Sequence, residues 1–361
     1  MEKKKKVLLL TGTVSSYRVP IYNLINNKYD LTVAYDVKDE SGEEREFNVI
    51  QLKPRTIKSL KFFPLSFYKL CNKFDAVIFV ADMHYLAYVS LPFFKRKYKT
   101  LAWTIGIRAS YKRNYDLKRK HDFLDKVYCS ILKRCDALIF YMKEATSFWK
   151  DTQLNKEKIF EAHNTVVVES IDRSKYKKDS ILFVGTLYKE KNIYELVDAY
   201  MDAYKKNCNI PVLNIVGNGA EYENLKRIVT ESKLEGKVNL LGRIIDEKIL
   251  SELFAKAYIC ISPNQAGLSV LKSLGYGVPF VTRYNSITGG ELLNIKDGYN
   301  GILYKEYNEL VDIILQTNIS PKKFEEMGDN AYSFYKENAT PENMANGVIA
   351  ALDYVLQNDK K

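Results

Sequence analysis

Short apolar runs rich in β-branched residues alternate with helical stretches along most of the chain, and this alternation constrains the fold more than any other feature. In the first half we expect strands at residues 7–12, 31–35, 76–80, 100–105, 137–141 and 165–168. In the second half we expect them at residues 181–185, 212–217, 238–241, 258–262, 279–282 and 301–304. Apolar strands separated by helices are typical of parallel sheets with helices on both faces. The sequence therefore predicts an α/β protein.

A polar stretch at residues 169–180 interrupts the alternation and predicts a linker. The 361 residues exceed the size at which a single hydrophobic core usually stops growing, so two α/β domains are expected. The predicted parts are an N-terminal domain at residues 1–170, a second domain at residues 171–337 and a closing segment at residues 338–361.

Positive charge is concentrated in the first half of the chain. Residues 1–170 hold 31 Lys and Arg against 19 Asp and Glu, whereas residues 171–361 hold 24 against 25. A basic domain can meet nucleic acid, anionic lipid or a phosphorylated substrate. No helix-turn-helix, RRM or zinc-finger pattern accompanies the charge, so nucleic acid is not an expected partner. The many Lys, Asn, Ile and Tyr residues are also compatible with the base composition of the genome. Part of the positive excess in the first half is then without a function.

The cysteine and histidine spacings indicate neither disulfides nor a metal site. The five cysteines form no CxxC pair, which favours reduced, mostly buried thiols in a cytoplasmic protein. His84, His121 and His163 fit no zinc-binding spacing, so no metal is expected. The apolar run that follows the first lysines is too short for the core of a secretory signal.

Two segments bear on contact with a membrane. Residues 76–94 are the longest apolar stretch, but Asp82 and His84 interrupt it, which favours a buried strand followed by a helix. Residues 54–74 mix phenylalanines with lysines, a composition that suits an element on an anionic membrane surface. The other interpretation, in which these aromatic side chains pack on the N-terminal sheet and the lysines are solvated, stays open.

The segment SPNQAGLSVLKSLGYGVPFVT, residues 262–282, carries the most specific motif. It resembles the donor-binding element of the group 1 nucleotide-sugar glycosyltransferases. That family has the GT-B fold, an α/β architecture of two Rossmann-like domains with parallel sheets facing across a cleft. Its element reads E-G-F-G-L-x-x-L-E-A-M-A-x-G-x-P, and the resemblance implies that the two glutamates hold the donor sugar and the ribose. Asn264 and Lys272 stand at those positions here, so the frame is kept and both acids are absent.

Residues 182–192, LFVGTLYKEKN, are similar to the family motif F-V-G-R-L-x-x-E-K-G. A strand, a turn at Gly185 and a helix start in this order point backbone N–H groups toward a phosphate. The resemblance implies that Lys191 contacts the donor diphosphate. Thr186 stands where the family has a second cation.

Further turns of the second half extend the resemblance. Gly217 lies in the G-x-G turn of IVGNGAE, and Arg243 follows the next strand, near the place of the base and phosphates in the family. Gly267 and Leu268 begin the helix whose positive end faces the donor. Glu291, in a GG-E turn, is our candidate for a carboxylate that replaces the missing acids.

Closing helices are predicted by Ser320-Pro321 and Thr340-Pro341, which place a capping residue before a proline. In the resembled family the last helix crosses back to the N-terminal domain, and residues 341–357 are placed for that.

The first half matches the family more loosely, as the part that binds the acceptor. Arg18 lies in the loop TGTVSSYRVPIYN after the first strand. In AWTIGIRAS the position of a family histidine is Ile105. His121 or His84 is a candidate substitute, although a lone histidine is more often structural. No DxD motif is present, consistent with metal-independent members of this fold.

The resemblance implies a retaining, metal-independent glycosyltransferase that uses a nucleotide sugar and no cofactor. Lys191, Arg243 and the helix dipole would stabilise the departing diphosphate, and Asn264 would hydrogen-bond the sugar. The implied acceptor is a lipid-linked saccharide or oligosaccharide in bacterial surface-polysaccharide synthesis, such as lipopolysaccharide or capsule, on the cytoplasmic face of the membrane. A GT-B binding or scaffold protein without activity is the alternative. A GT-B sugar-nucleotide epimerase lacks recognisable acid–base residues.

Overall fold

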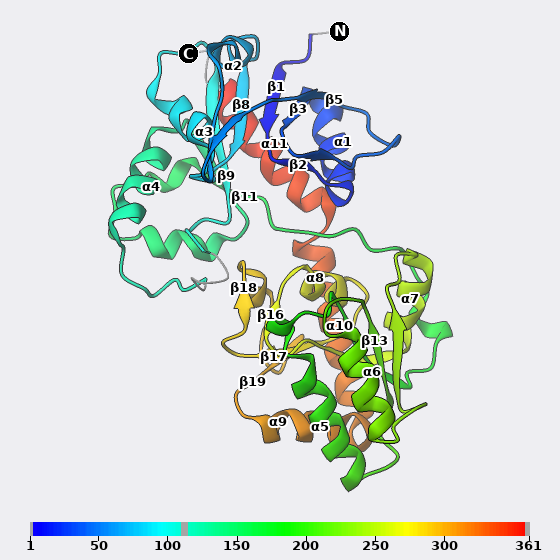
Figure 1. The fold of residues 1–361 in the computed structure, drawn as a ribbon. Coiled ribbons are helices and arrows are strands. Elements are labelled where there is room, and N and C mark those ends of the chain that lie inside the picture. The colour runs from blue at the N-terminus through cyan, green and yellow to red at the C-terminus, as the bar shows by residue number, and fades with distance from the viewer. Residues whose placement is uncertain (1–2, 110–114, 358–361) are drawn as a thin grey trace. The chain divides into compact units, whose positions relative to one another are not determined.

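The computed structural model describes residues 3–109 and 115–357, and its chain divides into two α/β units (Figure 1). Unit 1 comprises Met1–Thr165 and Thr340–Lys361, and unit 2 comprises Val166–Ala339. The sequence placed the division a few residues later, after residue 170. The closing segment is grouped with unit 1, so unit 1 is built from the two ends of the chain.

Unit 1 contains a seven-stranded parallel sheet in the order β11-β10-β9-β8-β1-β3-β5. Its strands are β1 (Lys6–Leu10), β3 (Asp30–Tyr35), β5 (Asn48–Gln51), β8 (Ala76–Val80), β9 (Lys99–Thr104), β10 (Ala137–Phe140) and β11 (Ile159–Glu161). The chain fills one side of β1 first and then returns to the other side with β8, so the strand order reverses between these two strands.

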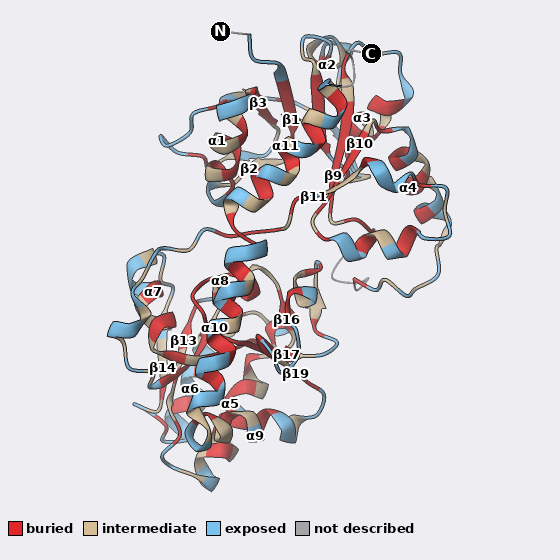
Figure 2. Cartoon of the chain, turned by 180° about the vertical axis from the view of Figure 1, so that it is seen from behind, coloured by how far each residue is buried: buried red, intermediate tan, exposed pale blue. Residues whose placement is uncertain are grey.

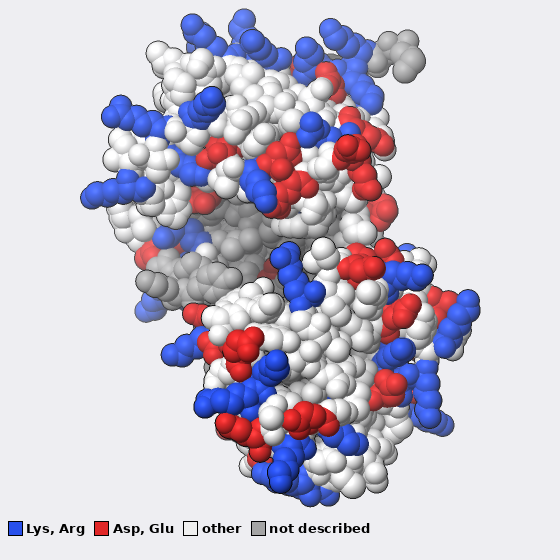
Figure 3. All heavy atoms as spheres, turned by 45° about the vertical axis from the view of Figure 1, so that its right-hand side comes forward, with Lys and Arg blue, Asp and Glu red and all other residues white. Residues whose placement is uncertain are grey.

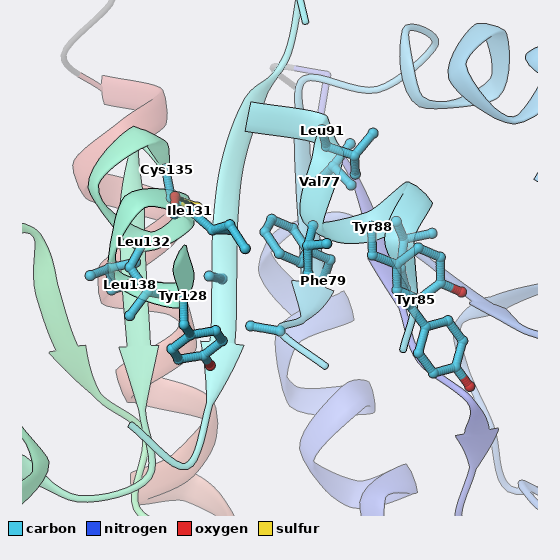
Figure 4. Close-up of a cluster of buried hydrophobic side chains, with 14 of the residues drawn as sticks. Val77, Phe79, Tyr85, Tyr88, Leu91, Tyr128, Ile131, Leu132, Cys135 and Leu138 are labelled. Atoms are coloured by element: carbon cyan, nitrogen blue, oxygen red, sulfur yellow. Dashed lines mark hydrogen bonds between the residues drawn. The ribbon is translucent and has the colours of Figure 1, made fainter. Parts of the chain in front are cut away.

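Successive residues of the central strands face opposite sides of this sheet, as the period of a strand requires. Leu8, Leu10 and Phe79 pack against α2 (Leu65–Cys71), α3 (Leu86–Ser90) and α4 (Phe123–Arg134). Figure 4 shows this core, with Tyr128 of α4 and Tyr88 of α3 beside Phe79. Val7, Leu9 and Ile78 face α1 (Val19–Lys28) and α11 (Pro341–Gln357) on the other side.

Two details of the predicted unit 1 are wrong. Residues 165–168 form no strand, because the chain leaves the unit there, and the edge position beside β10 belongs to β11. β5 was not predicted because its pattern is only half-buried at an edge. Small additional strands pair locally: β2 (Thr13–Val14) with β4 (Lys38–Asp39), and β6 (Arg55–Ile57) with β7 (Leu60–Phe62) in a hairpin.

Unit 2 repeats the architecture with a six-stranded parallel sheet in the order β14-β13-β12-β15-β17-β19. Its strands are β12 (Ser180–Val184), β13 (Val212–Val216), β14 (Val238–Gly242), β15 (Ala257–Ile261), β17 (Phe280–Arg283) and β19 (Gly301–Tyr304). Every one of these strands lies within a few residues of its predicted position. The strand order reverses between β12 and β15.

Helices cover both faces of this second sheet, and the strands between them are its most buried part (Figure 2). One core is formed between the strands and α5 (Ile193–Lys206), α6 (Tyr222–Glu231) and α9 (Tyr307–Ile319). The other core draws on α7 (Glu247–Lys256), α8 (Leu268–Gly275) and α10 (Pro321–Asn338). α10 and α11 each begin at the proline that predicted them.

Candidate active site

Two glycine loops lie back to back where β12 and β13 of unit 2 end. The Gly185 N–H donates to Val216 O at 3.0 Å, and the Leu187 N–H donates to Asn218 O at 3.0 Å. A Cβ atom at Gly217 would lie 1.9 Å from Gly185 O, and one at Gly219 would lie 2.2 Å from Leu187 O. Both glycines are therefore required by the close approach of two backbones.

Lys191 lies beneath the first of these loops, in the short turn η6 (Lys189–Lys191). Its Nζ would be 3.5 Å from a Cβ atom at Gly185, and only 6% of the residue is exposed. Burial lowers the pKa of Lys191 to about 8. Within the described residues no carboxylate lies within salt-bridge distance of this ammonium. Thr186, on the same loop, is exposed and brings no charge.

Asn264 joins this loop to the next one along the sheet. Its Nδ2 donates to Glu190 O at 3.1 Å, and its carbonyl accepts from Ile287 N at 2.9 Å. Directly after it, β16 (Gln265–Ala266) pairs in parallel with β18 (Ile287–Thr288). The structure thus brings Asn264 to the backbone of the turn that carries Lys191.

Lys272 has a different partner from the one its position suggested. Its Nζ lies 2.6 Å from Glu247 Oε1, at the start of α7, and Tyr276 one turn later donates to the same carboxylate at 3.3 Å. Lys272 and Tyr276 share a face of α8, which is why both reach Glu247. Glu247, which no motif identified, therefore neutralises the charge of Lys272.

Glu291 is used within its own turn. It begins η7 (Glu291–Asn294), and its Oε2 accepts from Gly289 N at 3.0 Å and Thr288 Oγ1 at 3.4 Å. The half-buried carboxylate stabilises the turn after β18. Its oxygens therefore have less capacity to accept hydrogen bonds from a ribose, the role that the sequence suggested for Glu291.

The remaining donor-side candidates lie at the same edge of the sheet. Gly267 is the N-cap of α8, Leu268 is its first residue, and a Cβ atom at Gly267 would meet nothing within 4 Å. Arg243 is exposed and follows the edge strand β14, beyond β13. Lys191 and the start of α8 therefore lie on the segments that follow β12 and β15, where the strand order reverses, a common location of ligand sites in such sheets.

Arg18 of unit 1 is buried, contrary to the expectation for a loop arginine. It is 7% exposed, and its guanidinium donates to Tyr141 OH at 3.1 Å, to Asn164 Oδ1 at 2.9 Å and to the sulfur of Met344. These partners lie directly after β10, at the end of the first segment of unit 1 and on α11. Arg18 thus ties together distant parts of unit 1, although it also lines a small hollow of about 270 Å³.

The two other acceptor-side candidates are placed differently from each other. Ile105 lines a cavity at the ends of β8 and β9. His121 packs edge-on against Phe148 and at a tilt against Trp149, and its Nε2 lies 2.7 Å from Phe148 O. His121 is therefore held as a structural residue and is not among those that line the cavity.

Comparison with known proteins agrees with this geometry. Residues 169–334 match the family model described as Glycosyl transferases group 1. This segment, which holds the candidate donor site, is thus similar to the group 1 glycosyltransferases. Crystal structures of Anabaena Alr3699/HepE in complex with UDP and with UDP-glucose superpose on 96% and 97% of this chain and on 99% of theirs, with TM-scores of 0.68 and 0.66 at 15% identity. The predicted GT-B fold is confirmed.

Sequence relatives point to the same family. The uncharacterized glycosyltransferase MJ1069 of Methanocaldococcus jannaschii is 28% identical over 60% of this chain and 58% of its own length. The alpha-monoglucosyldiacylglycerol synthase of Acholeplasma laidlawii is 25% identical over 50% of this chain and 45% of its own length. The chain thus spans about half the length of these curated relatives.

Proposed function

We propose that this protein transfers a sugar from a nucleotide-sugar donor to a hydroxyl of a lipid-linked saccharide in bacterial surface-polysaccharide synthesis, such as lipopolysaccharide or capsule. The observation that carries the proposal is Lys191, a buried cation without a carboxylate partner in the described residues, beneath a glycine loop of a group 1 glycosyltransferase domain. A diphosphate is the anion that such a loop and cation together recognise.

The chemistry follows from charge and position. When the bond between the sugar and the diphosphate breaks, the leaving oxygen gains negative charge, which Lys191 and the N–H groups at the start of α8 would stabilise. Asn264, fixed on the Lys191 turn, would hydrogen-bond the sugar. The proposal includes retention of anomeric configuration and independence from metal, which NMR of the product and assays in chelator test.

A uridine nucleotide is the first donor to test, because Anabaena HepE was crystallised with UDP and with UDP-glucose. The name of the Acholeplasma relative, a glucosyldiacylglycerol synthase, supports an acceptor that carries a lipid.

We also propose that the transfer takes place at the cytoplasmic surface of a membrane, to which the protein binds peripherally. α2 and the turn η2 (Leu91–Phe93) lie side by side in unit 1, since the rings of Tyr68 and Phe94 are 5.3 Å apart and Lys97 N donates to Asn72. Among the residues that the structure describes, no helix is long and apolar enough to cross a bilayer.

We call this region the α2/η2 surface, and it combines exposed apolar and basic side chains. Its exposed members are Leu65, Phe93, Phe94, Lys69, Lys73, Lys95 and Lys97. Lys and Arg project from much of unit 1 in Figure 3. Apolar side chains beside unpaired lysines suit anionic lipid.

Part of the stretch at residues 54–74 is excluded from this surface. Phe63 stacks on Phe67 at 4.9 Å and on Tyr88 at 5.4 Å, so it belongs to the core. Lys61 Nζ lies 2.5 Å from the buried Asp36 carboxylate. The packing interpretation therefore holds for Phe63, and the membrane interpretation is proposed only for the exposed residues of α2.

The deciding experiment is a panel of nucleotide sugars, UDP-glucose first, measured by thermal stabilisation and then by turnover. Stabilisation with transfer to a lipid-linked acceptor is the expected result. Stabilisation without any turnover would favour the inactive scaffold, and no stabilisation by any nucleotide would overturn the proposal.

A further inference from the structure

Unit 1 has its own cavity, of about 690 Å³, at the carboxyl ends of β8 and β9. Small-molecule sites typically have volumes of about 300–1,000 Å³. β8 adjoins β1, so the cavity lies beside the reversal of strand order in this sheet, the place where open α/β sheets bind ligands. No donor-side motif of the sequence falls here.

The wall of the cavity is largely apolar and includes an aromatic group suited to a sugar. Met83, Leu86 and Ile107 line it together with Trp103. Trp103 is 5% exposed, and its Nε1 is a buried donor without a hydrogen-bond partner in the described residues. A buried indole N–H usually has an acceptor, so this wall leaves a donor for a ligand or water to satisfy.

Most polar side chains that line the cavity are bound to neighbouring protein groups. The Thr104 hydroxyl is 2.6 Å from Tyr128 OH and accepts from Gly106 N. Arg108 is paired with Asp122 at 3.0 Å and with Asp125 at 3.4 Å. These groups hold the wall in place and have little capacity left for a ligand.

The pair formed by Asp82 and His84 differs from these groups. His84 Nδ1 lies 2.7 Å from Asp82 Oδ1, and the same oxygen accepts from His84 N at 2.9 Å. An ionised carboxylate only accepts, so Nδ1 carries a proton, and in the neutral imidazole Nε2 is left as an acceptor. In the described part of the chain Nε2 has no hydrogen-bond partner.

The backbone around His84 is also fixed. Lys61 N, in the hairpin of β6 and β7, donates to His84 O at 2.8 Å. Ser59 and Leu60 of that hairpin line the cavity as well. Asp82 therefore orients the imidazole of His84, and the hairpin holds the main chain of the same residue. Together they present Nε2 in a defined position.

We propose that this cavity binds the acceptor and that His84 Nε2 accepts a hydrogen bond from an acceptor hydroxyl, with the Trp103 wall packing against its apolar portion. The inference rests on the proposed function and specifies the chemistry of its acceptor: a hydroxyl-bearing group with an apolar face. Asp82 is then a positioning residue, because it acts only through His84.

Two substitutions separate this role from a structural one. His84→Asn keeps a donor near the Nδ1 position, for Asp82, but removes the acceptor at the Nε2 position. His84→Gln carries an amide oxygen to the Nε2 position but gives up the contact with Asp82. If the ring only orders the loop, the asparagine variant should resemble wild type and the glutamine variant should not.

The probe is n-octyl β-D-glucoside below its micelle concentration, a hydroxyl-bearing amphiphile. Titration of the full chain, followed by NMR of ¹⁵N-labelled histidine, is expected to shift the His84 ring signals and leave those of His163 unchanged. The dissociation constant should rise about fivefold to tenfold in His84→Asn, by the loss of one hydrogen bond, and less than about twofold in His84→Gln. His163→Asn is the matched control.

Three results would overturn the inference: no binding of octyl glucoside by wild type, equal affinities for both His84 variants and wild type, or the reverse order of the two variants. UDP-glucose affinity, measured on the same samples, tests the proposed function separately, because its expected site is in unit 2. If wild type did not bind UDP-glucose, the proposed function would be wrong. If only the affinity for octyl glucoside departed from expectation, the inference about the cavity would be wrong.

Discussion

In unit 2 the buried Lys191 has no carboxylate partner in the described residues, whereas the buried Arg18 and the partly buried Lys61 of unit 1 are held by protein groups. Arg18 is bound by Tyr141, Asn164 and Met344, and Lys61 by Asp36. Yet residues 1–170 carry the positive excess and residues 171–361 are nearly neutral. Net charge therefore does not locate an anion site. What counts is whether a cation lacks an internal partner.

The largest effect on this comparison is expected where the backbones of the two glycine loops of unit 2 approach each other most closely. Gly217→Ala would place a Cβ atom 1.9 Å from Gly185 O, so we expect a loss of about 3 kcal/mol in the free energy of unfolding. The measurement is urea denaturation followed by circular dichroism.

The matched control is Gly267→Ala, because a Cβ atom there meets nothing within 4 Å and the backbone has φ −110°. It should change the free energy of unfolding by less than about 0.5 kcal/mol. Equal losses for both variants would mean that the close packing of the loops is not what the glycines provide.

The second prediction concerns Lys191. Lys191→Met should weaken UDP binding by about 1.5 to 3 kcal/mol, the scale of a charge-assisted hydrogen bond, as measured by isothermal titration. In wild type the affinity should also fall as the pH rises above about 8, where Lys191 loses its proton. Unchanged affinity in the variant would remove Lys191 from the site.

The same lysine gives a pH dependence of stability without ligand. Its folded pKa of about 8 lies below the value of about 10.4 for an unfolded lysine, so the unfolded state binds more protons between these pH values. The free energy of unfolding should therefore rise with pH across this window, and less steeply in Lys191→Met. Lys178, whose pKa burial also lowers to about 8, contributes equally to both proteins.

A third prediction tests where the excess charge of unit 1 is used. Leu65→Ser combined with Phe94→Ser should lower partition onto anionic vesicles about tenfold, because both side chains are exposed on the α2/η2 surface. Vesicle flotation at two salt concentrations measures it. The matched control, Ile245→Ser with Ile319→Ser, removes equally exposed apolar groups from unit 2 and should leave partition unchanged. Equal loss in both pairs would contradict a specific membrane-facing surface.

The smallest effect is expected at the paired cation of unit 2. Lys272→Glu would face Glu247 with a like charge and should lower the free energy of unfolding by about 1 kcal/mol, since Glu247 is partly exposed. Adding Glu247→Lys should restore most of the loss. If the double variant is no more stable than the single one, the pair seen in the structure does not persist in solution.

How far the sequence predicts this protein depends on whether a feature is local. The strands of unit 2 follow from short apolar runs bounded by turn residues, and the prolines at positions 321 and 341 mark where α10 and α11 begin. The donor-side loops follow from glycine spacing, because a close approach of backbones accepts no other residue.

Interactions between distant residues could not be predicted in this way. Glu247 precedes Lys272 by 25 positions, and Met344 follows Arg18 by 326, so no local pattern announces either contact. His84 was weighed from sequence only as a lone histidine. Its pairing with Asp82 at i−2 is a local signal, but the cavity around it depends on the hairpin together with β8, α3, β9 and α4.

The grouping of α11 with unit 1 has a consequence for the order of events during synthesis. Residues of α11, among them Met344, Val348 and Leu352, complete the core that Leu9 and Ile78 begin. A ribosome translates these residues only after all of unit 2. Unit 2 is continuous in sequence and can close its core first, while the apolar face of the unit 1 sheet waits for its last helix. The half of the protein made first is thus expected to finish folding last, and during that delay its exposed face needs protection from aggregation.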